Sequence, residues 1–189
     1  MAKKTLKPAT LLFPLPAALL SVAAPGKRAN IITLAWVGVV SSIPPMVGVS
    51  IRPSRHSHAL VKEAGEFVLN IPADDMAEVV DGCGTLSGRA HDKFARFGLH
   101  ELPSGKVRSP GVAECPLALE CVVRQAIPLG SHELFLAEVV SVTADEEVLG
   151  PDGQVDAAKL SPLAYCPGDA RYFRLGGPIA DYGFSAKKR

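Results

Sequence analysis

The chain has 189 residues, of which 48% are hydrophobic and 21% are charged. These proportions are typical of a globular protein with a sizeable core, and they exclude a disordered chain. The formal net charge of +1 gives no reason to expect a nucleic acid or an anionic membrane surface as a partner. We therefore expect one domain over residues 1–189.

The N-terminal segment superficially matches a secretory signal, because three lysines precede an apolar stretch. Pro14 and Pro16 interrupt that stretch, so we interpret Leu15–Ala24 as the first strand of a sheet. No apolar run approaches the ~20 uninterrupted residues of a membrane helix. The four cysteines are far apart and lack a C-x-x-C pair, which predicts reduced thiols in a cytoplasmic protein and no zinc site. They are Cys83, Cys115, Cys121 and Cys166.

The stretch Arg28–Ser57 holds two apolar runs rich in Val and Ile, Ile31–Val40 and Met46–Ile51. Short β-branched runs bounded by turn residues predict strands that are buried on at least one face. The second run leads into a short predicted helix, with Ser57 as its N-cap and Gly65 as its C-terminal stop.

Polar side chains gather where this second strand passes into the helix. Exposed N–H groups and the dipole of a helix N-terminus favour negative charge, and guanidinium groups add paired donors. The segment therefore predicts a phosphate site, and the alternative is a solvated basic loop. The side chains are those of Ser50, Arg52, Ser54, Arg55 and Ser57.

Further strands and short helices follow in the rest of the chain. Acidic residues at Asp74-Asp75 open one helix, and Phe94 and Phe97 share a face of another that stops at Gly98. In Pro103–Pro116 we expect at most an edge strand. The remaining strands are predicted at Glu66–Ile71, Leu117–Ile127, Glu133–Val142, Leu163–Tyr165 and Arg171–Arg174. Seven or eight mostly antiparallel strands with three inserted helices indicate a closed or nearly closed barrel, one opening of which the helices cover.

Sequence motifs support neither hydrolytic nor metal chemistry. Ser87 lies outside a G-x-S-x-G elbow, and His56 and His58 lack a third ligand. Neither a Rossmann fingerprint nor a Walker loop is present. Asn30 and Thr33 are harder to interpret, because with Trp36 they do not alternate in one phase of a flat strand. On spacing alone, we expect Asn30 to support a turn, Thr33 to be an ordinary strand residue and Trp36 to lie in the core.

Taken in order, several segments together resemble one family, the flavin reductase-like proteins with an FMN-binding split β-barrel, in particular the flavoredoxin-like branch. The resemblance extends from about residue 14 to 175, nearly the whole chain. The segments are N-I-I-T-L-A-W at 30–36, P-P-M-V-G-V-S-I-R-P-S-R-H-S-H at 44–58, G-E-F-V-L-N-I-P at 65–72 and C-G-T-L-S-G-R-A-H-D-K-F at 83–94.

The resemblance implies a mainly β fold: an antiparallel split β-barrel of Greek-key type with short inserted helices, forming a single flavin reductase-like domain. It implies non-covalent FMN at a homodimer interface. Asn30, Thr33 and Trp36 would lie along the isoalloxazine ring. The residues implied at the ribityl phosphate region are Ser50, Arg52, Arg55, Ser57, Ser87 and Lys93. Asp92 is expected to be a helix cap.

Because FMN itself carries hydride and single-electron chemistry, no catalytic side chain and no metal are expected. The leading hypothesis is an FMN-dependent oxidoreductase with NADH or NADPH as a transient reductant. The alternative is a flavoredoxin-type electron carrier that a partner redox protein reduces. A third interpretation is a flavin-binding barrel without turnover.

Overall fold

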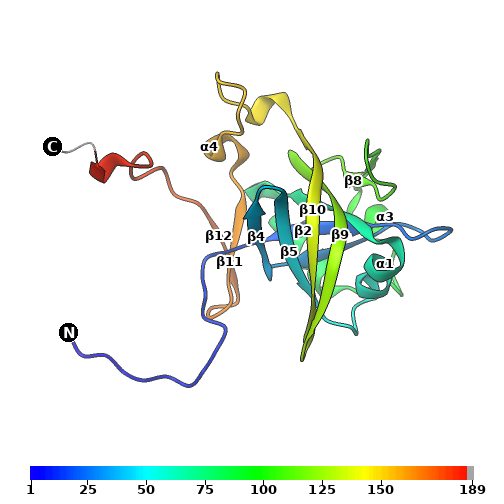
Figure 1. Cartoon of the computed structure of the whole chain (residues 1–189), viewed down its shortest axis with the longest axis horizontal. Helices are drawn as coiled ribbons and strands as arrows, with labels where there is room; N and C mark the ends of the chain where they lie inside the picture. The colour runs from blue at the N-terminus through cyan, green and yellow to red at the C-terminus, as the bar shows by residue number, and fades with distance from the viewer. Residues whose placement is uncertain (187–189) are drawn as a thin grey trace.

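The structure, a computed structural model, describes residues 1–186 (Figure 1). It is mainly β, as predicted. Its strands are β1 (Leu15–Pro16), β2 (Ala18–Val22), β3 (Asn30–Leu34), β4 (Val37–Ser42), β5 (Pro45–Ile51), β6 (Glu66–Ile71), β7 (Glu101–Leu102), β8 (Gly111–Val112), β9 (Leu117–Leu129), β10 (His132–Ala144), β11 (Leu163–Cys166) and β12 (Arg171–Arg174). Its helices are α1 (His56–Ala64), α2 (Ala77–Thr85), α3 (Lys93–Phe97) and α4 (Ala157–Leu160), with 3-10 turns η1 (Asp74–Met76), η2 (Glu146–Val148) and η3 (Phe184–Ala186).

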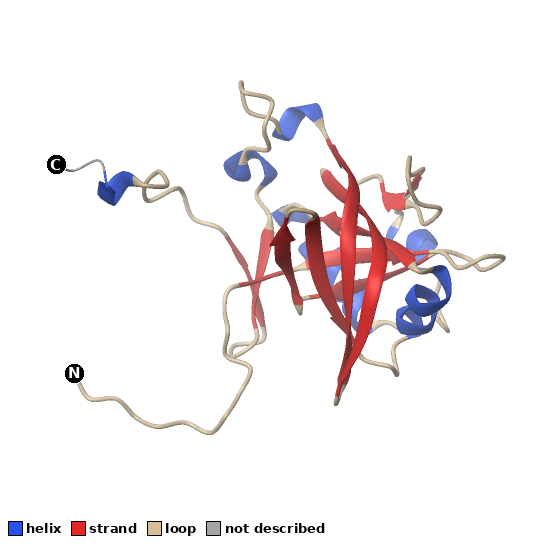
Figure 2. Ribbon diagram, in the orientation of Figure 1, coloured by secondary structure: helices blue, strands red, loops and turns tan. Residues whose placement is uncertain are grey.

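Seven strands form one curled antiparallel sheet in the order β3-β2-β6-β9-β10-β5-β4 (Figure 2). Strands β5 and β6 are consecutive in the chain, but β10 and β9 lie between them, which is a connection of Greek-key type. The two edge strands, β3 and β4, are also consecutive, and β3 contacts β5. The Ser50 amide donates to the Trp36 carbonyl at 2.9 Å. The barrel is therefore nearly closed, with a seam between β3 and β5.

The apolar run Ile31–Val40 was predicted to be one strand, but in the structure it belongs to two strands, β3 and β4. The chain bends at Ala35 and Trp36, so that β3 pairs with β2 while β4 pairs with β5. This bend is what brings the two edges of the sheet together. The predicted first strand is likewise divided, because β1 pairs with β11 and β2 pairs with β3 and β6.

Strand β2 is buried on both faces, which explains its mainly apolar sequence, and its one polar side chain, Ser21, donates to the Pro110 carbonyl at 2.6 Å. Leu20 points into the barrel core, where the largest side chains are Phe67 and Phe135. Leu19 points the other way, into a second core with Val80 of α2. The helices α2 and α3 therefore cover the outer face of β2 and β3, and this position places them beside the seam.

Of the predicted ends of α1 and α3, all but one match the structure, the stop of α3 at Gly98 among them. Gly65 ends α1 in the left-handed region, with φ of 68°, and Asp92 caps α3 by accepting a bond from the Ala95 amide at 3.1 Å. The N-cap of α1 is Arg55, so the prediction of Ser57 was wrong. Ser57 is buried inside the first turn, where its hydroxyl accepts a bond from Asn30 instead of capping the helix.

Carboxylates hold the segment between β6 and β9 against the barrel. Glu120 accepts bonds from the backbone amides of Gly105, Lys106 and Val107. Burial raises the pKa of Glu120, but these three donors more than offset it, so the pKa lies below its usual value. The predicted edge strand in this segment is β8, which pairs with β7.

Strands β1, β11 and β12 form a small separate sheet beside the barrel. The chain before and after this sheet forms an N-terminal arm, residues 1–14, and a C-terminal arm, residues 175–186. Both arms lead away from the barrel on the same side (Figure 1), and all their residues are exposed. Among the helices of residues 1–186, none has the length and apolar character needed to cross a membrane.

Candidate functional site

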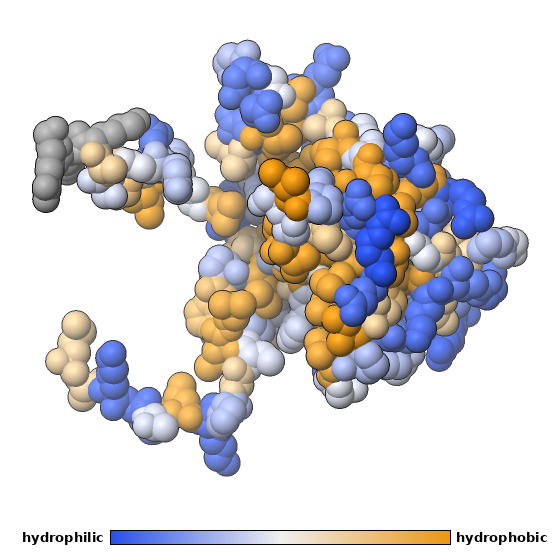
Figure 3. All heavy atoms as spheres, viewed as in Figure 1, coloured by the Kyte–Doolittle hydropathy of each residue, from blue (hydrophilic) through white to orange (hydrophobic). Residues whose placement is uncertain are grey.

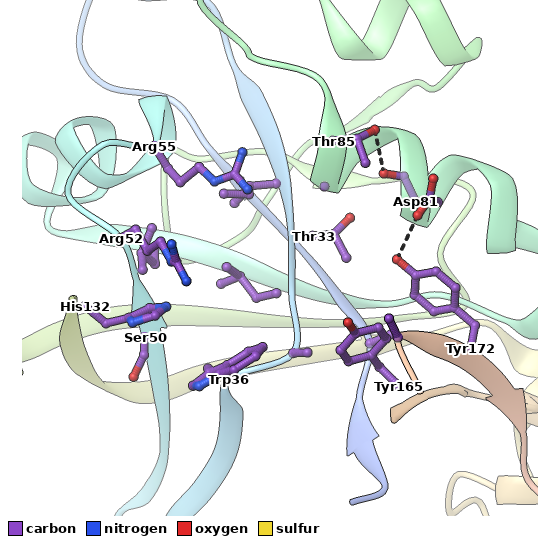
Figure 4. A pocket seen from close by; sticks show the side chains of 17 residues that line it. Thr33, Trp36, Ser50, Arg52, Arg55, Asp81, Thr85, His132, Tyr165 and Tyr172 are labelled. Carbon is purple, nitrogen blue, oxygen red and sulfur yellow. Dashed lines mark hydrogen bonds between the residues drawn. The ribbon is translucent and has the colours of Figure 1, made fainter. Parts of the chain in front are cut away.

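Two adjoining cavities open at the seam of the barrel and share Ile32, Arg52 and Arg55. The larger has a volume of about 530 Å³, and the smaller, more polar one about 210 Å³. The smaller is otherwise lined by Asn30, Ser54, His56, Ser57, Leu86, Ser87, Gly88 and Lys93. The larger is otherwise lined by Ala17, Thr33, Leu34, Ala35, Trp36, Ser50, Ile51, Asp81, Gly84, Thr85, His132, Tyr165, Ala170 and Tyr172 (Figure 4).

Asn30 and Gly88 form a close-packed wall of the smaller cavity. The Asn30 amide nitrogen donates to the Ser57 hydroxyl at 2.7 Å, and both residues are buried. A Cβ atom at Gly88 would lie 2.0 Å from Asn30 Oδ1 and 2.5 Å from its Cγ. Only glycine can therefore pass this closely, and the contact fixes Asn30 at the start of β3.

Lys93 lies under the same cavity as a buried cation. Its side chain is 3% exposed, and its ammonium group donates to the carbonyls of Ile31 at 2.7 Å and Cys83 at 2.6 Å. Burial lowers the pKa of Lys93 to about 8. Lys93 thus joins β3 to the end of α2, and one of its three N–H donors is not used by these two bonds.

The smaller cavity lies in a region of positive potential at the N-terminus of α1. His56 begins this helix, and its pKa is lowered by partial burial and by the nearby cations Arg89, Lys93, Arg28 and Lys27. Cationic side chains and helix N–H groups together favour an anion over a neutral ligand. The hydroxyls of Ser54, Ser57 and Ser87 add donors that suit phosphate oxygens.

A flat aromatic pair forms one wall of the larger cavity. Trp36, at the bend between β3 and β4, stacks on His132 at the start of β10, with ring centroids 5.9 Å apart and 12° between the planes. The pKa of His132 is lowered by burial and by the charge of Arg52. Figure 4 shows Arg52 and Arg55 on the same side of the cavity, above this pair.

The opposite wall comes from α2 and the terminal hairpin (Figure 4). The Tyr172 hydroxyl donates to Asp81 Oδ1 at 3.3 Å, and the Tyr172 ring packs against Tyr165 with centroids 5.4 Å apart. Burial and the Asp81 charge raise the pKa of Tyr172 to about 12, so its hydroxyl stays protonated. Thr33 donates to the Val80 carbonyl and so fixes α2 against β3.

All nine residues that the resemblance implied for the cofactor line one of these cavities. Their contact with a ligand stays a prediction. Thr33, Trp36 and Ser50 line the larger cavity, Asn30, Ser57, Ser87 and Lys93 the smaller, and Arg52 and Arg55 both. Sequence reasoning missed all five of the other polar or aromatic side chains of the larger cavity, Asp81, Thr85, His132, Tyr165 and Tyr172. They belong to three separate segments, and none stands in a motif that marks a site.

The geometry suits a ligand with an anionic end and a planar end. The smaller cavity supplies cations and hydroxyls, and the larger one, within the ~300–1,000 Å³ of small-molecule sites, supplies aromatic and aliphatic surface. Arg52 and Arg55 lie where the two cavities meet. A phosphorylated flat heteroaromatic compound fits this arrangement.

Comparison with known proteins identifies the family. A family model described as "Flavin reductase like domain" matches residues 10–174, and the chain therefore belongs to the flavin reductase-like family. Its fold is similar to that of the flavoredoxin of Desulfovibrio vulgaris (Miyazaki F), with a TM-score of 0.93 and 33% identity over 98% of this chain and 100% of that one. An FMN-binding protein from Thermus thermophilus, solved with bound 1-cyclohex-2-enone, has a TM-score of 0.79 and 25% identity over 96% of this chain and 98% of that one. The fold is the FMN-binding split barrel of these neighbours.

Relatives found by sequence include an uncharacterized protein of Archaeoglobus fulgidus, 38% identical over 117 residues, which are 62% of this chain and 66% of that protein. The reductase component of a 4-nitrophenol 4-monooxygenase/4-nitrocatechol 2-monooxygenase of Rhodococcus opacus is 32% identical over 112 residues, 59% of this chain and 57% of that protein. The matched region thus spans less than two thirds of the length of each of these two relatives, 66% of the first and 57% of the second.

Proposed function

We propose that the protein binds FMN without a covalent bond and acts as an NAD(P)H-dependent oxidoreductase, in one domain over residues 1–189. The observation that supports this proposal most strongly is the pair of adjoining cavities. The smaller is lined by cationic side chains, the larger by planar aromatic ones, and Arg52 and Arg55 line both. The Thermus neighbour is described as FMN-binding and the Rhodococcus relative as a reductase component, which supports both halves of the proposal.

The chain's own residues would bind and orient the cofactor. Arg55 and the N-terminus of α1 would hold the phosphate, and Lys93 would add positive charge beneath it. The backbone of β3 and the Trp36–His132 pair would flank the ring. When bound, FMN supplies hydride and single-electron chemistry, so the protein need only position it and control access.

The cofactor is tested by the absorption spectrum of the purified protein and the mass of the compound released by heat. A flavin spectrum with the mass of FMN is expected, and a colourless protein that also fails to bind added FMN would refute the proposal. Arg55→Ala should weaken FMN binding by about 1–3 kcal/mol, or about 5- to 150-fold in Kd. The matched control is Arg124→Ala, because Arg124 pairs with Glu138 on the surface and lines neither cavity.

A second function, that of an electron carrier, is favoured by the similarity to flavoredoxin over nearly the full chain. The two functions differ in their reductant. NADH or NADPH alone should bleach the anaerobic protein within seconds if it is an oxidoreductase of the first kind. Full reduction by a low-potential chemical donor, with no response to either nucleotide, would leave only the carrier.

We also propose that the protein is a cytoplasmic homodimer. The dimer is an expectation carried over from the family resemblance, and the location rests on four free cysteines, three of them buried. Sedimentation at micromolar concentration should give the mass of two chains, and the mass of one chain would contradict the dimer.

A further inference from the structure

Arg52 is a cation without a carboxylate partner at the junction of the two cavities. It lines both of them, and its side chain is exposed. Within residues 1–186 its guanidinium group forms no ion pair, although four other arginines do: Arg28, Arg108, Arg124 and Arg174. A guanidinium group in this state, on the wall of a ligand cavity, is available to a negatively charged ligand.

Strand pairing places Arg52 beside the aromatic wall of the larger cavity. Strand β5 pairs with β10, and Glu133 lies opposite Ile51, so the same register continued by one residue puts His132 opposite Arg52. Directly opposed side chains lie on one face of a sheet, with Cβ atoms about 4.5–5.5 Å apart. His132 stacks on Trp36, and Figure 4 shows Arg52 above this pair. Arg52 therefore lies where a planar ring would bind.

Arg52 and Arg55 act on different cavities. The pKa of His132, in the larger cavity, is lowered by burial and by the charge of Arg52. The pKa of Lys93, beneath the smaller cavity, is lowered chiefly by burial and further by the charge of Arg55. His132 is therefore mainly neutral at pH 7, and Arg52 is the cation that faces the aromatic wall. The one acidic residue that lines the larger cavity, Asp81, lies on the opposite wall (Figure 4).

A cation at this position distinguishes the two redox states of a flavin. A hydride carries two electrons and one proton, so its transfer from NADH or NADPH to the ring adds one negative charge to the ring and leaves the nucleotide oxidised. The charge of the FMN phosphate does not change in this transfer. A positive charge beside the ring favours the state that carries the added charge. A ring that fills the cavity also excludes water, which strengthens this interaction.

We infer that Arg52 stabilises the negative charge that the flavin ring gains on reduction, while Arg55 binds the phosphate in both redox states. Arg52 thus makes bound FMN easier to reduce. The inference rests on the proposed FMN site and deepens it, because it assigns the reduction potential of the site to one side chain. It applies to the NAD(P)H-dependent oxidoreductase and to the electron carrier alike, since the potential of bound FMN governs both.

The test measures, for each full-length variant, the Kd of oxidised FMN and the midpoint potential of bound FMN by anaerobic titration against a reference dye. With the potential of free FMN, these two values give the Kd of reduced FMN. Arg52→Gln removes the charge and Arg52→Lys keeps it. Arg52 is exposed and unpaired, so both variants should fold, as checked by circular dichroism.

Two further variants serve as comparison and control. Arg55→Ala removes a cation assigned to the phosphate. Arg124→Ala removes an exposed arginine that pairs with Glu138 and lines neither cavity. Figure 3 shows hydrophilic side chains over β9 and β10, the strands that carry this surface pair.

We expect Arg52→Gln to weaken the binding of reduced FMN about tenfold more than that of oxidised FMN. This ratio corresponds to a midpoint potential about 30 mV lower, because the couple transfers two electrons. Arg52→Lys should show a smaller shift, since its charge remains, and Arg124→Ala none. Arg55→Ala should weaken both redox states by the same factor and leave the potential unchanged, because the phosphate has the same charge in both.

Two results would overturn the inference. If Arg52→Gln weakens both redox states equally, Arg52 acts on the phosphate, and if it weakens neither, Arg52 acts on no part of FMN. Either result would leave the FMN site itself intact. A wild-type protein that binds FMN in neither redox state would overturn the proposed function together with the inference.

Discussion

The contact between Gly88 and Asn30 gives a quantitative prediction for the wall of the phosphate-sized cavity. In Gly88→Ala, the new methyl group would lie 2.5 Å from Asn30 Cγ, so rotation of the amide alone cannot relieve the clash. The Asn30 side chain must leave its rotamer, and its 2.7 Å bond to Ser57 is lost. Overpacking costs about 1–3 kcal/mol and the buried hydrogen bond about 1 kcal/mol. We expect a total destabilisation of about 2–4 kcal/mol.

Asn30→Ala should cost about 1–3 kcal/mol, because it leaves the buried Ser57 hydroxyl without its partner. It also removes the atoms with which the Gly88→Ala methyl clashes. The double variant should therefore be about as stable as Asn30→Ala alone, so the coupling energy should equal the cost of Gly88→Ala, about 2–4 kcal/mol.

Urea unfolding followed by circular dichroism measures the four free energies of this cycle. Gly105→Ala is the matched control, since a Cβ there would meet only Glu120 Oε1 at an ordinary 3.8 Å. Additive effects of the two substitutions, within about 0.5 kcal/mol, would show that Gly88 and Asn30 are not in contact and would refute the reasoning.

Three further predictions concern titration and thiol reactivity. Because the pKa of Glu120 is lowered in the folded protein, its stabilisation is present above the unfolded pKa of about 4.3 and is lost as the pH falls through the folded pKa. Glu120→Gln should therefore cost about 1.5–3 kcal/mol in urea unfolding at pH 7, and a cost that persists unchanged in acid would contradict this. Arg52→Gln should raise the pKa of His132 toward 6.5 in an NMR titration, since the charge of Arg52 helps to lower it; an unchanged pKa would show that the charge of Arg52 does not act on His132. Cys166 alone should react with a thiol reagent at pH 8, because the other three thiols are buried with raised pKa values, and rapid labelling of more than one thiol would be inconsistent with that burial.

Local patterns were enough to predict where most strands lie, although two of the predicted strands are each divided in the structure, and to predict the cationic lining of the smaller cavity. Glu66–Ile71 was predicted with its observed bounds, because a short β-branched and aromatic run ended at a proline. Arg52 and Arg55 were predicted together because the strand and the helix that they join are adjacent in sequence. The predicted barrel followed from the number and spacing of such runs.

Features that depend on distant contacts were not predictable. The bend at Ala35 and Trp36 contains no glycine, proline or other residue typical of turns. It arises because β3 pairs with β2 while β4 pairs with β5. Ser57 has the chemistry of an N-cap, but Asn30 lies close enough to use its hydroxyl. Tyr172 reaches the cavity from 91 residues beyond Asp81, its hydrogen-bond partner, and no local pattern encodes such a contact.

The seam of the barrel links ligand binding to the stability of the fold. The larger cavity is bordered by the edge strand β3 on one side and the end of β5 on the other, so a ligand there supplies neighbours that β3 otherwise lacks. Binding should therefore raise the free energy of unfolding by RT ln(1 + [L]/Kd). Without a ligand, β3 and β5 should be the first to separate along the seam, with the bend at Ala35 and Trp36 as the hinge. Ligand binding and closure of the barrel seam are then thermodynamically coupled, so an increase in one increases the other.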